Sequence, residues 1–571
     1  MTEIIDGFFK NHKKIYGIYS FRLYVYILCT VGLCWIGVWR SIGNGAQWSL
    51  AINCTGICIF PMILCRIDFK SLSKIPYIAW TAVSAIGAYP LFNYLKPGTD
   101  YDFAMAVAVL NVWLYGLVAI WIFSSIIKRG FIKSSCTIFF LIWLFFIVFA
   151  IVSVNEAFWP VWFLIMIGGF YLTPIDKEKI DELMLGITDG ILIAFFWIQG
   201  RAFLYRPYDV DPRYKGHFNN VNIAAMFFLI VYVGWLARLG YARRKQKVNR
   251  LECCICFLLA GAMWDFAILT ISRSSLLAFV LITIMYLILE EIVTFKNGLK
   301  GFISKGVLLF FVFIMMFLPV YGCVRYIPAL RHHPIWYEDY SEEKVHSWDP
   351  IDSDKYTELD EFLSKLIGKT IRTIKEIDSD IIEGTPADEL VDVVALPDMP
   401  IEAEIVSKDS YGFILEYSDG VEPGSDFDHP LMEEYSGNNI GKSFLSGRLS
   451  IYRYFIMGFN LWGHKEAYPG VYLSKYEFYG HTHNSFIQIT YCFGMVAGAM
   501  FIFLILGSQI MIIIKSLKND NGLLWRELLP LLLLSAFIIN GMFEMTAMLG
   551  KFMFIAAFLS LIVTVRRFSE M

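Results

Sequence analysis

Charged side chains are scarce in this chain. Asp, Glu, Lys and Arg make up 17% of its 571 residues, whereas 57% of the residues are hydrophobic. So apolar a composition excludes an ordinary soluble domain. The apolar runs also lack the residue-by-residue alternation of barrel strands, which leaves the α-helix as the element that crosses a membrane.

Motifs for nucleotide and metal chemistry are missing too. The sequence has no convincing G-x-x-x-x-G-K or dinucleotide-binding glycine pattern. Cys253, Cys254 and Cys256 lack the paired spacing of metal ligands. The acidic stretch DSDKYTELDEF has Tyr356 at the third ligand position of an EF-hand and lacks the required glycine. We therefore expect chemistry that uses no nucleotide, metal or other cofactor.

Apolar runs long enough to cross a bilayer recur along the chain. They predict an all-α polytopic membrane protein with about fourteen transmembrane helices, each about 20 residues long. The predicted spans lie near 22–40, 46–65, 75–95, 104–127, 137–154, 157–173, 183–200, 221–238, 252–271, 274–293, 306–323, 486–514, 527–547 and 549–565.

Lys and Arg cluster in every second connection between these runs, as in RLGYARRKQKVNR at 238–250. This positive-inside pattern predicts that both termini are cytoplasmic. The expected organisation is a cytoplasmic N-terminus at 1–21, helices 1–11 at 22–323, a large extracytoplasmic loop at 324–485, helices 12–14 at 486–565 and a cytoplasmic tail at 566–571.

The large outer loop has two parts. Between Glu338 and Glu434 it contains 28 acidic and 7 basic residues, with one helical pattern followed by short alternating runs. These features predict a small acidic α+β insert at about 336–435. An amphipathic, aromatic-rich segment at about 446–470 follows it and is expected to lie along the membrane surface.

Polar residues from distant segments are expected to meet at the outer face. Outward arginines have no topological role, and the planar guanidinium binds phosphate in a bidentate manner. Histidine is the natural general base near neutral pH. The candidate site residues are Arg201, Arg206, Arg213, Asn222, Arg273, Arg448, His481, His483 and Asn484.

Each candidate also has a structural interpretation. His483 can be a helix-start residue with Asn484 as its N-cap. Arg273 follows Asp265 by two helical turns, so the two can form an ion pair on one helix face. The pair His481 and His483 lacks an identifiable third metal ligand. Three acidic residues inside predicted spans also need partners there: Asp189, Asp265 and Glu544.

Four stretches resemble one family of bacterial envelope enzymes, the O-antigen ligase and polymerase superfamily. They are RYKGHFNNVNIAA at 213–225, ISRSSLLAF at 271–279, SGRLSIY at 446–452 and HNSFIQITYCFGMVAG at 483–498, and the similarity covers about 200–515. In the last stretch Ala497 replaces the second glycine of the family pattern. The family's Asn-Pro-Asn is altered here to Asn220-Val221-Asn222.

The resemblance implies a GT-C-like fold and an inverting, metal-independent glycosyl transfer at the outer face of the bacterial cytoplasmic membrane. The donor would be a glycan on undecaprenyl diphosphate, and the acceptor a lipid A-core, another envelope lipid or a glycan. His483 takes the position of the general base. Arg273 and Arg213 match positions that hold the donor diphosphate, and Arg448 matches the family's loop arginine. Membrane lipids are expected partners and nucleic acids are not.

Three further functions remain open at this point. A polymerase of the same superfamily would extend the glycan on its carrier, although a long outer loop directly before the histidine motif favours the ligase. Transfer to protein would use the same donor chemistry. A transporter of anionic glycolipids would also need arginines, but it usually carries interrupted helices and ionisable residues near the membrane midplane.

Overall fold

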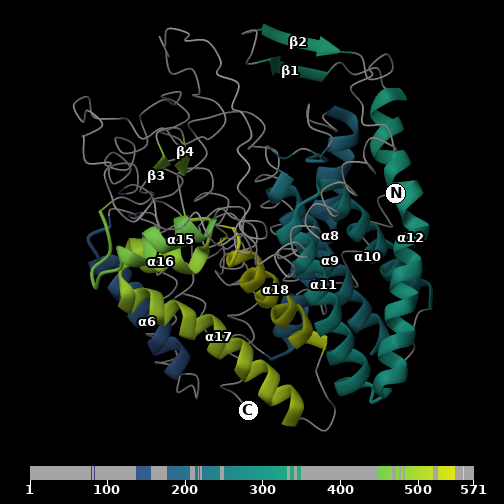
Figure 1. Cartoon of the computed structure of the whole chain (residues 1–571). Helices are drawn as coiled ribbons and strands as arrows, with labels where there is room; N and C mark the ends of the chain where they lie inside the picture. The colour runs from purple at the N-terminus through teal and green to yellow at the C-terminus, as the bar shows by residue number, and fades with distance from the viewer. Residues whose placement is uncertain are drawn as a thin grey trace, which may run out of the picture.

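The described part of the protein is predominantly helical and contains two short antiparallel hairpins (Figure 1). The computed structural model describes residues 79, 83, 137–155, 177–205, 213–216, 218, 221–244, 250–330, 335–339, 344–348, 448–465, 471–474, 477–479, 482–518, 525–544, 546 and 557. The predicted spans at 22–40, 46–65, 104–127, 157–173 and 549–565 lie outside these residues, apart from Ala557, and most of the one at 75–95 does so too.

The helices and strands follow one another as separate, mostly long elements. They are α6 (Thr137–Val152), α8 (Lys177–Tyr205), α9 (Val221–Arg243), α10 (Arg250–Thr270), α11 (Arg273–Leu287), the π-helix η3 (Ile288–Thr294), α12 (Gly298–Leu330), β1 (Ile335–Asp339), β2 (Lys344–Trp348), α15 (Arg448–Met457), β3 (Val471–Ser474), β4 (Glu477–Tyr479), α16 (Ser485–Phe493), α17 (Met495–Lys518) and α18 (Trp525–Gly541).

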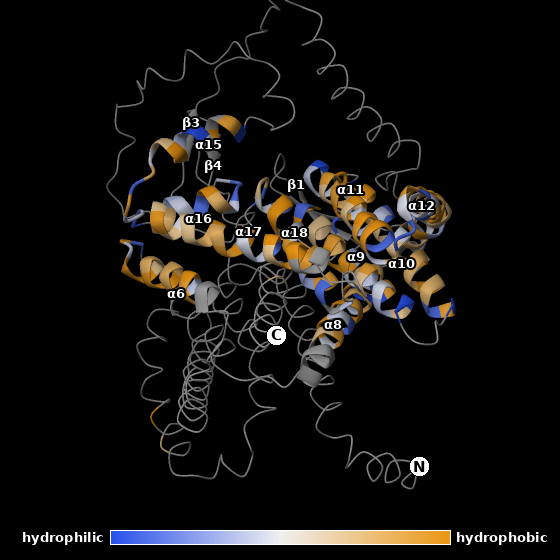
Figure 2. Ribbon diagram, turned by 90° about the horizontal axis from the view of Figure 1, so that it is seen from below, coloured by the Kyte–Doolittle hydropathy of each residue, from blue (hydrophilic) through white to orange (hydrophobic). Residues whose placement is uncertain are grey.

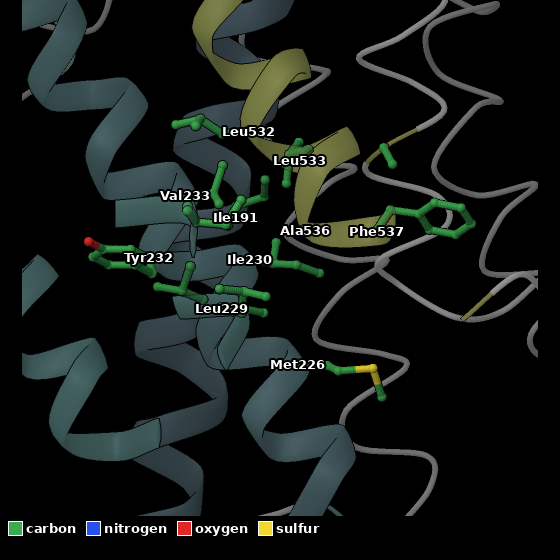
Figure 3. Close-up of a cluster of buried hydrophobic side chains, with 14 of the residues drawn as sticks. Ile191, Met226, Leu229, Ile230, Tyr232, Val233, Leu532, Leu533, Ala536 and Phe537 are labelled. Carbon is green, nitrogen blue, oxygen red and sulfur yellow. The ribbon is translucent and has the colours of Figure 1, made fainter. Parts of the chain in front are cut away.

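Helix α9 is the central element of the helical body. It is apolar around its whole circumference, and such a helix is stable only when neighbours cover every side. Helices α8, α10, α11 and α18 pack around it, and Figure 2 shows it enclosed in this group. Figure 3 shows the contact between three of these helices, with Ile191 of α8 and Leu229, Ile230 and Val233 of α9 near Leu532 and Leu533 of α18.

Helix α12 lies at the edge of the same group (Figure 2). Of the 18 most apolar consecutive residues in α12, only 22% are buried, against 89% for α9. The exposed side chains of α12 include Phe310 and Met315. It approaches α10 closely at Gly261, where a Cβ atom would lie 2.6 Å from Val312 Cγ1. Small residues permit such close helix contacts in membranes, so α12 combines a tight inner contact with an outer face suited to lipid.

The membrane character predicted from the sequence is confirmed. Five helices of the described part are long and apolar enough to cross a membrane: Val221–Arg243, Arg250–Thr270, Arg273–Thr294, Gly298–Val324 and Met495–Ile514. Shorter apolar helices lie at Leu141–Val152 and Glu527–Gly541. Helix α8 contains the predicted span 183–200 but is not among the five.

The predicted span at 486–514 is two helices, not one. Gly494 separates α16 from α17 with a φ of +92°, a conformation that side-chain-bearing residues rarely adopt. The segment 458–465 satisfies backbone groups at the break. Met495 N–H donates to the carbonyl of Asn460 at 2.9 Å, and His464 N–H donates to the carbonyl of Cys492 at 3.1 Å. The apolar run at 486–514 gives no sign that another segment packs at Gly494 and interrupts the helix, so the sequence predicted a continuous helix.

Charges gather at the end of the bundle where α9 finishes. Arg238 pairs with Asp189 at 2.7 Å and with Glu252 at 3.0 Å. Arg243 pairs with Glu291 at 2.7 Å, and the Arg244 guanidinium donates to Glu290. Both glutamates of η3 are buried. The basic run at 238–250 therefore does more than anchor topology, because its arginines neutralise acids on α8, α10 and η3.

The segment before α16 contains a short helix. Helix α15 falls within the amphipathic stretch expected at 446–470, and its Ile451 and Phe455 pack on Tyr491 of α16. Leu449 and Met457 are exposed. Hairpin β1–β2 coincides with the start of the predicted acidic insert, and the rest of that insert lies outside the described residues.

Candidate functional site

The candidate residues are positioned by helix ends that meet at one end of the bundle. Asn222 lies in the first turn of α9, and Arg273 is the first residue of α11. His483 directly precedes the N-cap of α16, and Arg448 begins α15. Glu544 follows the end of α18. Hydrogen bonds between these termini, described next, bring residues up to 322 positions apart into contact.

Glu544 is the centre of this cluster. Its Oε1 atom accepts from Arg448 Nη2 at 3.0 Å and from Asn222 Nδ2 at 3.0 Å. Its Oε2 atom lies 3.6 Å from His483 Nδ1. Glu544 is 8% exposed. A carboxylate with so little water contact needs compensating partners. Arg448 and Asn222 donate hydrogen bonds to it, whereas His483 Nδ1 lies beyond hydrogen-bond distance and forms an ion pair with it only when the imidazole is protonated.

The loop that carries Glu544 is held against the start of α16. Ser485 Oγ donates to the Glu544 carbonyl at 3.0 Å, and Thr546 N–H donates to Ser485 Oγ at 2.7 Å. Asn484 Nδ2 donates to the Met542 carbonyl at 3.1 Å. These backbone contacts fix the path of the chain on either side of Glu544. Its carboxylate therefore has a defined position relative to His483.

His483 adopts a strained backbone conformation. Its φ is +50°, and a residue other than glycine in this region costs of order 1–3 kcal/mol unless its surroundings hold it there. Tyr452 OH lies 3.3 Å from the His483 carbonyl and 3.0 Å from that of Met542. Burial raises the pKa of the Tyr452 hydroxyl, which therefore stays protonated and able to donate.

Arg448 joins the segment before α16 to the cluster around Glu544. Besides Glu544, its guanidinium donates to the carbonyl of Phe543. Its side chain is 20% exposed, so the ion pair with Glu544 is only partly screened by water. Because a guanidinium has five N–H donors, these two contacts leave other N–H groups able to bind an anion.

Asn484 is the N-cap of α16, as its structural interpretation predicted. Its Oδ1 atom accepts from Phe486 N–H at 3.0 Å and Ile487 N–H at 3.1 Å. Such a cap satisfies amides that the helix itself leaves without partners. The side-chain oxygen of Asn484 is thus fully used, and the side chain contributes to the site by shaping the turn that contains His483.

Arg213 is attached to the end of α10. Its Nε donates to the Thr270 carbonyl at 3.1 Å, and the next residue, Tyr214, donates its N–H to the Leu269 carbonyl at 2.8 Å. The Tyr214 ring is buried against Phe228 and Phe266 and its OH accepts from Gln199 Nε2 at 2.5 Å. Burial raises the pKa of the Tyr214 hydroxyl. The buried tyrosine holds Arg213 beside the start of α11.

Arg273 and Arg201 have less defined surroundings. Arg273 is exposed at the start of α11, and Arg201 is partly buried near the end of α8. Arg273 and Asp265 do not share a helix, because the chain turns at Ile271 between α10 and α11. Both carboxylate oxygens of Asp265 are buried and have no hydrogen-bond partner among the described residues. Arg206 and His481 lie outside the described part.

The arrangement suits proton transfer beside a bound anion. A carboxylate near Nδ1 orients an imidazole and stabilises its protonated form, which leaves Nε2 as the nitrogen that can exchange a proton with a ligand. Arg448 contacts the same carboxylate, and Arg213 and Arg273 lie where α10 ends and α11 begins. Within the described residues no group of three or more His, Cys, Asp or Glu side chains gathers as metal ligands would.

Sequence reasoning missed the role of Glu544 as the common partner. Its only signal was an acidic residue in an otherwise apolar run, where a charge is costly. Ser272 and Tyr452 had no signal of their own, although both lie inside stretches that carried the family resemblance.

A scan of the chain against protein-family models finds no match, and searches of curated proteins and of solved structures find none.

Proposed function

We propose that this protein is a membrane glycosyltransferase that moves a glycan from a polyprenyl diphosphate, undecaprenyl diphosphate in bacteria, to a hydroxyl of an envelope acceptor. The observation that carries the proposal is the contact of Glu544 with both His483 and Arg448. A general base and an anion-binding cation are the two groups that this reaction requires. The family resemblance of the same stretches supports the choice of donor.

In the proposed reaction His483 removes the proton of the acceptor hydroxyl. The acceptor oxygen forms a bond to the anomeric carbon as the bond from that carbon to the diphosphate oxygen breaks, with inversion at carbon. The electron pair leaves on the diphosphate, and the proton ends on the imidazole. Glu544 stabilises the imidazolium so formed and is a positioning residue, since it acts through His483.

The leaving diphosphate needs fixed positive charge. Arg273 is exposed at the start of α11, and Arg213 is held beside that start by its bond to Thr270. Arginine stays charged throughout the reaction and binds phosphate oxygens in pairs. In this proposal Arg273 and Arg213 bind the diphosphate. Arg448 donates a further hydrogen bond to the diphosphate from one of its remaining N–H groups once the outer loop is in place.

The apolar helices α9, α10, α11, α12 and α17 are consistent with a donor that stays in the membrane. A polyprenyl chain is soluble only in lipid, so the transferring residues must lie at the end of such helices. The site does lie there. We propose further that this end faces outward across the bacterial cytoplasmic membrane, with both termini inside, as the distribution of Lys and Arg predicts.

The test uses purified protein in lipid nanodiscs with a polyprenyl-diphosphate glycan and candidate acceptors. We expect a new glycan–acceptor linkage and release of free polyprenyl diphosphate. His483→Ala and Arg273→Ala should each lower the rate about 100-fold or more, the usual contribution of a general base or a charge-stabilising donor. Arg250→Ala, a matched change of an exposed arginine at the opposite end of the bundle, should not lower it.

The products also separate the related activities. A longer glycan still attached to the carrier would identify a polymerase, while carrier release with a new acceptor linkage identifies the ligase. Transfer by both His483→Ala and Arg273→Ala at the wild-type rate would remove the roles assigned to these residues.

Transport of an anionic glycolipid is the second candidate, and one observation favours it. The break between α16 and α17 at Gly494 resembles the interrupted helices of transporters. The His483, Glu544 and Arg448 cluster lies at helix ends rather than along the break, which favours chemistry. Movement of intact donor across the nanodisc or vesicle membrane, with no bond broken and no effect of His483→Ala, would support transport instead.

A further inference from the structure

A chain of hydrogen bonds continues from Glu544 into the bundle. Asn222 Nδ2 donates to Glu544, and Asn222 Oδ1 accepts from Ser272 Oγ at 3.0 Å. Ser272 Oγ lies 3.3 Å from Ser275 Oγ, and Ser275 Oγ lies 3.4 Å from Asn540 Oδ1. Ser272, Ser275 and Asn540 are each at most 2% exposed. Two hydroxyl protons cannot make all three of these contacts hydrogen bonds at once: the Ser272 proton goes to Asn222 Oδ1, the shortest contact, and the Ser275 proton goes to Ser272 or to Asn540. These polar contacts link α9 and α11 to α18, the helix that leads into Glu544.

Ser272 lies at the N-cap of α11, but its hydroxyl does not cap the helix. It occupies the N-cap of α11, where a serine normally accepts from an amide of the first turn, but here it makes no such bond. The preceding residue, Ile271, has a φ of +50°. A β-branched residue in this conformation is strained, and such strain is concentrated at functional sites.

The donor from Ser272 decides which way the Asn222 amide faces. The two ends of an amide are nearly the same size but opposite in polarity, so an amide without a partner for its oxygen can turn over. Because Oδ1 receives the Ser272 proton, Nδ2 must face Glu544. The carboxylate oxygen Oε1 then has two donors, Asn222 and Arg448, and Oε2 remains directed to His483.

We propose that Ser272 and Asn222 are positioning residues that hold the Glu544 carboxylate against His483 and so fix the orientation of the imidazole. The inference rests on the proposed function, because it names residues that prepare the base of that reaction. At metal sites, partners one step removed from a ligand commonly contribute about 10- to 100-fold in affinity or activity, and we expect an effect of the same order here.

The first test compares Ser272→Ala with Ser272→Thr in the transfer assay. The alanine variant frees Asn222 Oδ1, so we expect kcat to fall about tenfold. The KM for the donor should change less than about twofold, because the arginines that bind it are untouched. The threonine variant keeps the hydroxyl and should recover most of kcat. Ser508→Ala is the matched control, since Ser508 is equally buried but donates only to Leu504 of its own helix.

The second test does not require activity. Diethyl pyrocarbonate acylates neutral imidazole, and mass spectrometry reports the rate for the peptide that contains His483. We expect this rate to differ from that of wild type in Ser272→Ala, because the carboxylate no longer fixes the orientation of the ring, and to be unchanged in Ser508→Ala.

The two measurements separate the inference from the function on which it rests. Suppose that wild-type protein transfers glycan and that Ser272→Ala matches it in kcat and in His483 acylation. That result overturns the positioning role and leaves the proposed function intact. Equal loss of kcat in the alanine and threonine variants also overturns it. If wild-type protein transfers no glycan, the proposed function fails, and the acylation rates alone decide whether Ser272 acts on His483.

Discussion

At the scale of single residues, Glu544 combines two roles that a soluble enzyme usually separates. It is the counter-ion of Arg448, which holds the outer loop, and it is the partner of His483, which in the proposal removes a proton. A buried charge pair stabilises little by itself, but loss of one member leaves the other uncompensated. One change at Glu544 should therefore affect both the loop and the base.

The first prediction concerns Glu544→Gln. The amide keeps the size of the carboxyl group but removes its charge, so it neither neutralises Arg448 nor stabilises a protonated His483. We expect transfer to fall about 100-fold or more, as when the acid of a catalytic triad is changed to its amide. Transfer is measured with purified protein in nanodiscs.

Glu252→Gln is the control for that experiment. Glu252 accepts from Arg238 at 3.0 Å at the other end of the bundle, and its amide variant should transfer glycan normally. Wild-type transfer by Glu544→Gln would show that the carboxylate has no part in the reaction.

At the scale of elements, the break between α16 and α17 is the feature that places the site. It lets α16 be a short helix that begins just after Asn484 and ends before Gly494, so that its start faces Glu544. The crossing segment approaches so closely that glycine is required on both sides. A Cβ at Gly494 would lie 2.1 Å from the Leu461 carbonyl oxygen, and one at Gly463 would lie 2.1 Å from that of Cys492.

The second prediction is that Gly494→Ala destabilises the protein severely. The substitution meets both a backbone clash and a φ of +92°. Strain of this kind costs several times the effect of about 1 kcal/mol seen for a typical point mutation. The midpoint of heat unfolding in detergent should fall by many degrees. Gly200→Ala in α8 is the matched control, because a Cβ added at Gly200 would meet nothing within 4 Å, and it should leave the midpoint unchanged or slightly raised.

The third prediction concerns the contact between α9 and η3. Arg244 donates to Glu290, whose side chain is 0% exposed. Arg244→Met should lower the free energy of unfolding by about 3–5 kcal/mol, because Glu290 loses a partner in a site without water. The double variant Arg244→Met/Glu290→Leu should recover most of that loss. A double-mutant cycle in detergent measures the coupling, and additive effects of the two changes would contradict the buried pair.

At the scale of the whole molecule, two groups of charges occupy opposite ends of the helical body. The His483, Glu544 and Arg448 cluster lies where α9 begins, and the arginines from Arg238 to Arg244 lie where it ends. The basic run predicts that the second end is cytoplasmic, which puts the candidate site on the other side.

The fourth prediction tests this orientation with two positions on α12. In a chain whose 11 cysteines are replaced, Leu299→Cys and Tyr326→Cys each place one thiol at an exposed site, with exposed fractions of 67% and 59% in the native residues. An impermeant maleimide added to intact cells should label Tyr326→Cys alone, and both after permeabilisation. Labelling of Leu299→Cys alone in intact cells would reverse the orientation.

The sequence identified the end of the bundle where polar residues meet but not the bonds between them. Periodicity and charge predicted the spans from α9 to α12, and the N-cap role of Asn484 followed from residue type and position. The pairing of Glu544 with Asn222 and Arg448 could not be predicted, because contacts between residues 322 and 96 positions apart depend on packing. The break between α10 and α11 was predicted, because one apolar run ends at 271 and the next begins at 274, but the positive φ of Ile271 was not, since isoleucine seldom adopts it.

The paired glycines at Gly463 and Gly494 have a consequence for biogenesis. Lipid offers no replacement for the backbone bonds that Asn460 and His464 make to the two sides of the interruption. If α16 and α17 were released before the segment 458–465 packed against them, the Met495 amide and the Cys492 carbonyl would lack the partners that this segment supplies. Residues 458–518 should therefore leave the translocon as one unit, with the segment 458–465 already packed against the break between α16 and α17, rather than helix by helix.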